Sequence, residues 1–353
     1  DRKEARKMDR FTQYAMVASD EAIEHANFNL DALDKTRVGV IWGAGIGGLQ
    51  TFQSEVLNFA AGDGTPRFNP FFIPKMIPDI APGMISIKYG FQGPNFATVS
   101  ACASSANALI DALNYIRLGH ADVMVCGGSE ACVAISGVAG FNALHALSTR
   151  NGDPETASRP FDKDRDGFVL GEGAGALVLE TLEHAQQRGA TIYGEIVGGG
   201  LSADAYHMTA PHPDGDGATL VMKNALKDAG ISASEVDAVN MHGTSTPLGD
   251  LAESNALKNV FGDHLYKMNI NSTKSMTGHL LGAAGVIEAI STILSIQHNI
   301  VPPTINHFTD DENIDPNINF TFNKAQKREV NVAMSNTFGF GGHNACVVMR
   351  KFV

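Results

Sequence analysis

Segments of two different periodicities alternate along this chain of 353 residues. Short runs rich in β-branched residues, such as residues 38–42, fit buried strands, whereas residues 9–26 repeat apolar side chains at helical spacing. Parallel strands need helical crossovers, and those helices then cover the faces of the sheet. The alternation therefore predicts an α/β fold built on mixed, mostly parallel sheets.

Two regions, residues 98–118 and 269–297, repeat the order strand, small-residue turn, helix. A length of about two average domains, together with this repeat, predicts two related halves, residues 1–190 and 191–353. The turns of a duplicated fold meet at one central crevice. The predicted strands are 38–42, 96–99, 122–126, 175–180, 192–197, 236–241, 267–271, 330–335 and 345–349, and the predicted helices are 9–26, 107–118, 218–229, 251–260 and 282–297.

The composition argues against several classes of protein. Hydrophobic residues make up 44% of the chain, which excludes disorder, and the net charge of −12 argues against general nucleic-acid binding. The most apolar stretch, residues 283–296, carries Glu288 and is shorter than a membrane span of ~18 residues. The four cysteines lack disulfide or metal spacings, so we expect a cytoplasmic protein, although a first residue Asp1 leaves a removed targeting segment open.

Cys102 lies among small residues between a predicted strand and a predicted helix. The N-terminus of a helix lowers the pKa of a thiol and favours the thiolate, which is the nucleophilic form. A buried, inert cysteine is the alternative, and for an arbitrary cysteine it is the better interpretation. We adopt it for Cys126, Cys132 and Cys346, which lie in or just after strand patterns.

Two further turns carry histidines. His242 ends a predicted strand, where α/β sheets place their sites, and Thr244 and Thr246 add hydroxyl groups. Lys274 and His279 lie in the turn before a predicted helix. Taken singly, these residues fit capping or solvated loops as well or better. Together with the cysteine they form a set suited to nucleophilic catalysis.

Two glycine-rich segments can direct backbone N–H groups at a ligand. Residues 338–342 interleave three glycines with Phe338 and Phe340, either as such a turn or as a hairpin with core aromatics. Residues 43–48 match the GxGxxG pattern of dinucleotide-binding proteins loosely. No acidic residue stands about twenty positions further on in a βαβ context, because Asp63 follows a helix and lies between two glycines, so we expect no nicotinamide cofactor.

Four motifs in this order closely resemble the β-ketoacyl-acyl carrier protein synthases, most of all the elongating type II enzymes of fatty acid synthesis. They contain Cys102, His242, Lys274 with His279, and residues 336–342, and the resemblance covers nearly the whole chain. It implies a thiolase-like fold of five layers and a homodimer. The implied reaction is decarboxylative condensation of an acyl thioester with malonyl-acyl carrier protein, without a cofactor beyond the phosphopantetheine that the carrier protein brings.

The resemblance also implies individual roles. Cys102 would be the acylated nucleophile, and His242 with His279 would bind the malonyl carbonyl and stabilise the enolate. Lys274, paired with Glu253, would set the protonation of the histidines. The other implied roles are an oxyanion hole from the N–H groups of Cys102 and Phe340, a gate from Phe338 and Phe340, a pocket end at Ile46, and phosphopantetheine binding by Thr244 and Thr246.

Two more expectations concern an ion and a partner. Some family members bind a monovalent cation, and its surroundings here would be Asn240, Glu288, Ser335 and Asn336. An acidic carrier protein requires a local basic surface. If the N-terminal residues are helical, one face carries Lys3, Arg6, Lys7 and Arg10. A solvated helix end is the alternative interpretation of these four residues.

The chain departs from the family pattern in two places. Family members usually have a further strand of the first sheet before the helix at residues 9–26, and we expect that strand to be absent here. His145 stands where close relatives often carry an arginine at the carrier-protein surface, so that contact would differ.

Several alternatives share part of this pattern. A ketosynthase of a polyketide or secondary lipid pathway shares every motif and differs in acyl preference. A thiol hydrolase would release only free acid, and a non-catalytic homologue would have no need to keep Cys102, His242, Lys274 and His279 together. A thiolase would need a second cysteine as base, an initiating synthase would have asparagine in place of His279, and a chain-length factor would lack Cys102.

Overall fold

The computed structural model describes residues 2–353. The strands of the first sheet are β1 (Val38–Gly43), β2 (Asn95–Thr98), β3 (Val123–Glu130) and β4 (Gly173–Glu180). Those of the second sheet are β5 (Glu195–Ala203), β6 (Ala238–Asn240), β7 (Asn269–Asn271), β10 (Val332–Gly339) and β11 (His343–Arg350), and β8 (Ile300–Val301) pairs with β9 (Gln326–Lys327). The longer helices are α2 (Arg10–Ala26), α3 (Leu49–Ala60), α5 (Ile80–Tyr89), α6 (Ser104–Arg117), α7 (Ile135–Ala143), α9 (Asp216–Ala229), α10 (Pro247–Phe261) and α12 (Ala284–His298), and the shorter ones are α1 (Arg2–Ala5), α4 (Phe72–Met76), α8 (Leu182–Gln187) and α11 (Lys274–Thr277).

Both main sheets are mixed, as predicted. The first has the strand order β2-β1-β3-β4 and the second the order β5-β11-β10-β6-β7. In the first sheet β1 pairs in parallel with β2 and β3, and only β3 and β4 are antiparallel. In the second sheet β6 pairs in parallel with β7 and β10, whereas β11 is antiparallel to both neighbours. The first sheet therefore has one strand fewer than the second.

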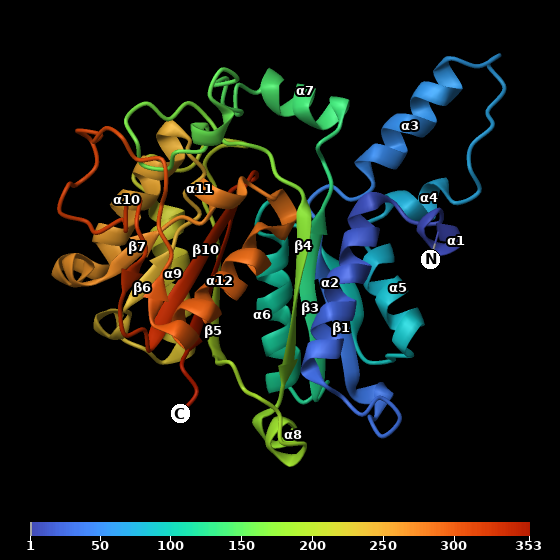
Figure 1. The fold of residues 1–353 in the computed structure, drawn as a ribbon, viewed down its shortest axis with the longest axis horizontal. Coiled ribbons are helices and arrows are strands. Elements are labelled where there is room, and N and C mark those ends of the chain that lie inside the picture. The colour runs from blue at the N-terminus through green and yellow to red at the C-terminus, as the bar shows by residue number, and fades with distance from the viewer. Residues whose placement is uncertain (1) are drawn as a thin grey trace.

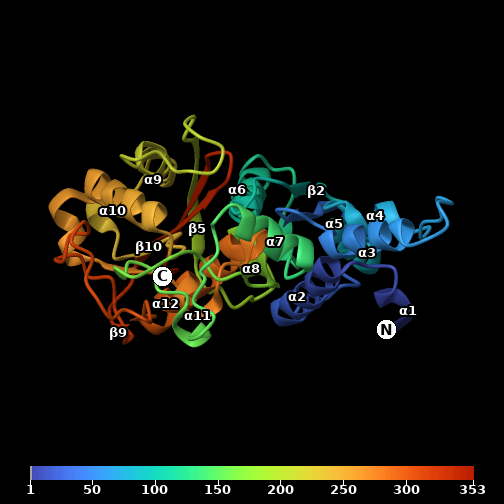
Figure 2. The same cartoon turned by 90° about the horizontal axis from the view of Figure 1, so that it is seen from above.

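Helices and sheets form five layers across the molecule (Figures 1 and 2). α2 and α5 pack on the outer face of the first sheet, α6 and α12 lie between the two sheets, and α9 and α10 cover the second sheet from outside. α6 follows β2, and α12 follows β7, each an edge strand of its own sheet. The two central helices therefore come from corresponding positions in the two halves.

Small side chains allow the two central helices to approach closely. Ala106 of α6 and Ala289 of α12 are buried in one apolar cluster. A Cβ atom on Gly285 would lie only 2.8 Å from the Cβ of Ala106, so glycine is required at this contact. Because the distance between packed helices depends on the side chains between them, the glycine and alanines bring the N-terminal ends of α6 and α12 together.

The segment Leu281–His298, which contains α12, has the length and hydropathy of a membrane-spanning helix. The expectation that no stretch reaches that length was therefore wrong. In the fold, 61% of this segment is buried within the protein, because α12 occupies the central layer.

The predicted strands and helices are present, with shifted ends; α6, for example, begins at Ser104 rather than Asn107. The prediction of one basic helix face near the N-terminus was wrong. α1 ends at Ala5, and Asp9 caps a separate helix by accepting a hydrogen bond from the N–H of Phe11 (3.2 Å). Lys3 and Arg10 therefore lie on different helices.

Candidate active site

Cys102 lies in the tight turn between β2 and α6. Ala101 adopts a φ of +50°, a left-handed conformation that non-glycine residues seldom take. Ser104 stabilises the turn, since its hydroxyl donates to the Ala101 carbonyl (2.6 Å) and accepts from the N–H of Ser100 (3.0 Å). The small polar residues around Cys102 thus fix the backbone that presents the thiol.

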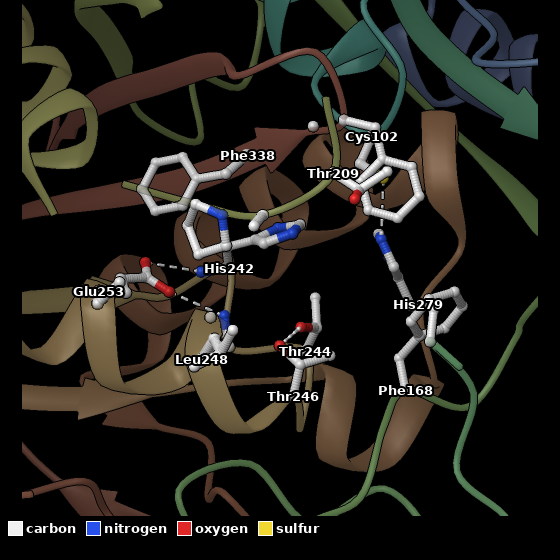
Figure 3. A pocket seen from close by; sticks show the side chains of 18 of the residues that line it. Cys102, Phe168, Thr209, His242, Thr244, Thr246, Leu248, Glu253, His279 and Phe338 are labelled. Carbon is white, nitrogen blue, oxygen red and sulfur yellow. Dashed lines mark hydrogen bonds between the residues drawn. The ribbon is translucent and has the colours of Figure 1, made fainter. Parts of the chain in front are cut away.

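The Cys102 thiol is 9% exposed, at the bottom of a pocket. Burial raises the pKa of Cys102 to about 12, and the nearby charge of Lys274 opposes this only in part. The expectation of a resting thiolate was therefore wrong, because the loss of hydration outweighs the helix dipole. A protonated thiol can act as a nucleophile only if a base takes its proton, and the Nε2 atom of His279 lies 3.1 Å from Sγ (Figure 3).

His242 and His279 face each other beside this thiol. Their ring centroids are 5.2 Å apart and the ring planes are nearly perpendicular. Phe168 packs edge-on against His279, and Phe338 packs against His242. Burial, together with the charge of Lys274, holds the pKa of both histidines well below its usual value. Both rings are therefore neutral at pH 7, and each has one N–H group to donate.

Lys274 is almost completely buried and forms an ion pair with Glu288 of α12. Glu288 is the ion-pair partner because it faces the central layer from the helix that follows the lysine turn, whereas Glu253, which we expected to act with Lys274, is influenced by the lysine only through its charge. Burial raises the pKa of Glu288, whereas Lys274 and a hydrogen bond from Thr337 (3.4 Å) lower it. Lys274 does not line the pocket, so it acts on the histidines through its charge.

Glu253 instead holds the backbone of the His242 turn. Its two oxygens accept the N–H groups of His242 and Gly243, each at 2.9 Å, as the dashed lines in Figure 3 show. The amide of Asn336 donates a third hydrogen bond (3.2 Å). Burial raises the pKa of Glu253 to about 7 in spite of these donors. Its carboxylate therefore contacts the main chain of His242 and leaves the imidazole ring free to face the pocket.

The pocket has a volume of about 420 Å³, which is in the range of small-molecule sites. Its lining includes eight of the residues predicted from the sequence: Cys102, His242, Thr244, Thr246, Glu253, His279, Phe338 and Phe340. The hydroxyls of Thr244 and Thr246 lie 3.0 Å apart on one wall (Figure 3). Ile46 lies outside this cavity and is 41% exposed.

Other lining residues escaped the sequence analysis. Phe141 and Phe168 pack against each other, and Thr209 and His212 come from the loop between β5 and α9. These residues belong to loops and helices that meet the motifs only in the folded chain, so no local pattern identified them. His145, which the sequence placed at the carrier-protein surface, lies exposed in the lining with a φ of +52°.

The loop of residues 338–342 joins β10 to β11 beside Cys102. A Cβ atom on Gly339 would lie 2.7 Å from the Ser100 carbonyl and 3.0 Å from the Cys102 nitrogen. Gly339 therefore serves the close approach of two backbones, and a bulkier side chain at this position would collide with the Cys102 turn. The left-handed conformations of this loop are at Gly341 (φ +89°) and Gly342 (φ +74°).

The surroundings expected for a monovalent cation are rich in oxygen atoms. Within residues 2–353, the side-chain oxygens of Asn240, Ser335 and Asn336 are buried without a hydrogen-bond partner. Glu288, the fourth expected member, is engaged by Lys274. The three amide and hydroxyl oxygens suit a hard cation, which would satisfy them if bound. The described residues contain no cluster of three histidine, cysteine or carboxylate side chains suited to a metal ion.

The basic residues near the N-terminus lie away from the pocket of their own chain. Figures 1 and 2 place α1 at the opposite end of the molecule from α9 and α10. Lys3 and Arg6 are exposed, and Lys7 forms an ion pair with Glu4 (2.8 Å). The structure does not bring these side chains to the rim formed by the pocket residues.

Comparison with known proteins gives a consistent result over both halves. Residues 1–185 match the family model of the beta-ketoacyl synthase, N-terminal domain, and residues 193–308 match that of the beta-ketoacyl synthase, C-terminal domain. The 3-oxoacyl-[acyl-carrier-protein] synthase 2 of Staphylococcus aureus (strain COL) is 52% identical over 353 residues, which are 100% of this chain and 84% of the relative. The synthase of the same name from Synechocystis sp. is 49% identical over 354 residues, with the same coverage.

Solved structures agree with these relatives. A beta-ketoacyl synthase from Burkholderia phymatum superimposes with a TM-score of 0.93 at 37% identity, over 100% of this chain and 85% of that one. A type II polyketide ketosynthase, solved in complex with its acyl-carrier protein and bound to the hexaketide, gives a TM-score of 0.92 at 35% identity, over 98% of this chain and 85% of that one.

Proposed function

This chain belongs to the beta-ketoacyl synthase family, and from that premise we propose that it is the condensing enzyme of fatty acid elongation, a 3-oxoacyl-[acyl-carrier-protein] synthase. The single observation that supports this most is the contact of the Cys102 thiol with His279, beside a second neutral imidazole in the same pocket. A nucleophile and two neutral donors are the groups that acyl transfer and enolate stabilisation require.

In the first half-reaction, Sγ of Cys102 attacks the thioester carbonyl of the acyl group. The thiol proton moves to Nε2 of His279 as the C–S bond forms, and the departing phosphopantetheine thiolate takes a proton in return. The N–H groups of Cys102 and Phe340 donate to the oxyanion. Because Gly339 packs directly on Cys102, both N–H groups belong to segments that adjoin at the thiol.

In the second half-reaction, His242 and His279 donate hydrogen bonds to the thioester carbonyl of malonyl-acyl carrier protein, with His279 now in the tautomer that carries its hydrogen on Nε2. The bond to the carboxylate breaks, CO2 leaves, and the electron pair remains as an enolate. The enolate carbon attacks the acyl group on Cys102, the carbon–sulfur bond breaks, and the 3-oxoacyl product is released. The expelled cysteine thiolate takes up one proton from solvent, which restores the thiol. No strong base is required, since loss of CO2 forms the enolate without removal of a proton.

Incubation with acyl-carrier protein substrate and malonyl-acyl carrier protein tests the proposal. Mass spectrometry should show a carrier-bound product longer by one two-carbon unit and bearing a 3-oxo group. Free fatty acid alone would indicate the thiol hydrolase, and release of neither product would contradict the proposal.

Polyketide synthesis is the second candidate, because ketosynthases of such pathways superimpose on this chain. Their identities of 35% and 33% are lower than the 52% of the elongating synthase from Staphylococcus aureus. Elongation of saturated acyl chains therefore has the better support. Preferred extension of 3-oxoacyl over saturated substrates in a direct competition would favour the polyketide pathway.

The partner that we propose is an acyl carrier protein. Because Lys3, Arg6 and Lys7 lie away from the pocket of their own chain, their proposed role is long-range attraction of the acidic carrier. Replacement of Lys3 and Arg6 by glutamate should raise KM for carrier-bound substrates several-fold at low salt, mostly through a slower association rate. The matched control is Arg67→Glu, at an exposed arginine elsewhere on the surface. The kinetics are compared at low and high ionic strength. An unchanged KM at low salt would contradict docking at these residues.

The loop of residues 338–342 is proposed to open when the acyl chain enters. Gly341→Ala should slow acylation of Cys102 several-fold and destabilise the loop by about 1–2 kcal/mol, because φ is +89° and alanine disfavours that region. The new methyl group would lie 3.0 Å from the movable ring of His343, so the fold should persist. Rapid-quench acylation and thermal unfolding measure both effects. A wild-type acylation rate would contradict the gate.

We also propose a cytoplasmic homodimer that needs no cofactor beyond the carrier's phosphopantetheine. β2 is an edge strand, and apolar side chains beside it are exposed: Ile87 is 75% and Val99 61% exposed. Unpaired strand edges and apolar patches are surfaces that a second copy can cover. Sedimentation analysis tests the dimer, and a monomer at assay concentration would contradict it.

A further inference from the structure

The glycine-rich turn of residues 43–48 surrounds a carboxylate of the same chain. Its successive N–H groups point at Glu130, the last residue of β3: Gly45 donates to Oε2 (2.8 Å), and Ile46 and Gly47 donate to Oε1 (3.2 and 3.1 Å). Consecutive N–H groups in such a turn form a concave anion site, which in other proteins holds phosphate. Here the site is filled by Glu130, which explains a GxGxxG-like pattern without a nucleotide.

A fourth donor comes from the other half of the molecule. The N–H of Gly282 donates to Oε2 of Glu130 (3.1 Å), from the turn that carries His279 into α12. The two turns touch directly, because a Cβ on Gly282 would lie 2.2 Å from the nitrogen of Gly45. One side chain therefore bridges the turns of both halves.

Four backbone N–H groups face the carboxylate of Glu130, two at each oxygen. The side chain is fully buried, and this burial raises the pKa of Glu130 above its usual value, although the four N–H bonds oppose the rise. Both donor turns precede helices, α3 and α12, whose N-terminal ends carry positive partial charge. Through these four hydrogen bonds the side chain of Glu130 joins the segments that precede α3 and α12.

The Glu130 site lies next to the turn that carries Cys102. A Cβ on Gly45 would lie 3.0 Å from the carbonyl oxygen of Ala101, the residue before Cys102. The glycine-rich turn therefore contacts the cysteine turn on one side and the His279 turn on the other. We propose that Glu130 is a positioning residue, whose carboxylate holds the His279 turn against the Cys102 turn and so sets the distance between imidazole and thiol.

The kinetic part of this inference rests on the proposed function. In Glu130→Gln, one oxygen is replaced by an NH2 group that faces N–H donors, so about half of the bonds are lost. We expect kcat for CO2 release and for condensation to fall about 10–100-fold, as for a misplaced catalytic group, with KM for malonyl-acyl carrier protein unchanged. The matched control is Glu172→Gln, because Glu172 also accepts a backbone N–H, from Val133 (2.7 Å), but bonds only to residues of the first half.

Hydrogen exchange supplies a readout that is independent of the reaction. Glu130→Gln should lose amide protection in peptides that cover residues 44–49 and also in those that cover 280–285, whereas Glu172→Gln should lose it in neither. Loss restricted to 44–49, or wild-type kcat in a folded Glu130→Gln protein, would overturn the inference. If Glu130→Gln does not fold, Glu130→Asp decides, since it keeps the charge but shortens the reach: it should lower kcat, and a wild-type kcat would overturn the inference.

A wild-type enzyme that forms no 3-oxoacyl product would contradict the proposed function alone. The exchange experiment would then still decide whether Glu130 ties the two turns together.

Discussion

Cys102→Ser should lower condensation by a factor on the order of 10⁴–10⁶, the usual cost of removing a nucleophile. A serine hydroxyl is a much weaker nucleophile than sulfur, and the pocket offers it only the neutral His279 as a base. CO2 release from malonyl-acyl carrier protein should persist, because both imidazole donors remain. Retention of labelled acyl group on the protein and release of labelled CO2 are measured side by side.

Cys132→Ser is the control for this variant. Cys132 is buried in the same apolar cluster as Cys102. The control therefore replaces sulfur by oxygen at a neighbouring buried cysteine. The control should keep acylation and condensation. Acylation at a wild-type rate in Cys102→Ser would show that another residue is the nucleophile.

His279→Ala should lower CO2 release by about 10²–10³, the cost of removing one preorganised oxyanion donor. Acyl transfer to Cys102 should fall less, even though Nε2 lies 3.1 Å from the thiol, since hydroxide or a buffer base can take the thiol proton at higher pH. The two half-reactions should therefore separate, in the direction opposite to that of Cys102→Ser. The same pair of labels measures both.

His242→Ala is the matched comparison, because His242 shares the pocket with His279 and packs against its ring. It should impair CO2 release and leave acyl transfer almost intact. If His279→Ala lost acyl transfer and kept CO2 release, the assignment of its role would be wrong. Equal loss of both activities in both variants would show that the site cannot be divided into two steps.

The sequence predicted the fold and most of the pocket for a physical reason. Alternating strands and helices leave few arrangements, and the carboxyl ends of strands meet at one crevice. Cys102 and His279 follow corresponding strands of the two halves. The repeated order of strand, turn and helix therefore places them before the two central helices, α6 and α12. Their contact depends on the close packing of α6 and α12, which small residues such as Gly285 permit.

Properties that depend on burial and on distant partners could not be predicted in this way. The ion-pair partner of Lys274 is Glu288 rather than Glu253. Which carboxylate reaches the lysine depends on the side of the helix from which it projects, and spacing along the chain does not show this. The pKa of Cys102 was expected in the wrong direction, since a helix N-terminus is visible in sequence and desolvation is not. No sequence pattern indicated a role for Glu130, because its four hydrogen-bond donors come from two turns that are distant in the chain.

The burial of sulfur in this protein also bears on its resistance to oxidants. Burial raises the pKa of all four cysteines, Cys102 included. Peroxide attacks the thiolate, so oxidation to sulfenic acid is slow wherever the thiol stays protonated and shielded from water. In the proposed mechanism, Cys102 becomes a strong nucleophile only as its proton moves to His279, whose Nε2 atom lies 3.1 Å from the sulfur. If Cys102 is the nucleophile that we propose, the burial that keeps its thiol protonated should also protect it from irreversible oxidation between turnovers.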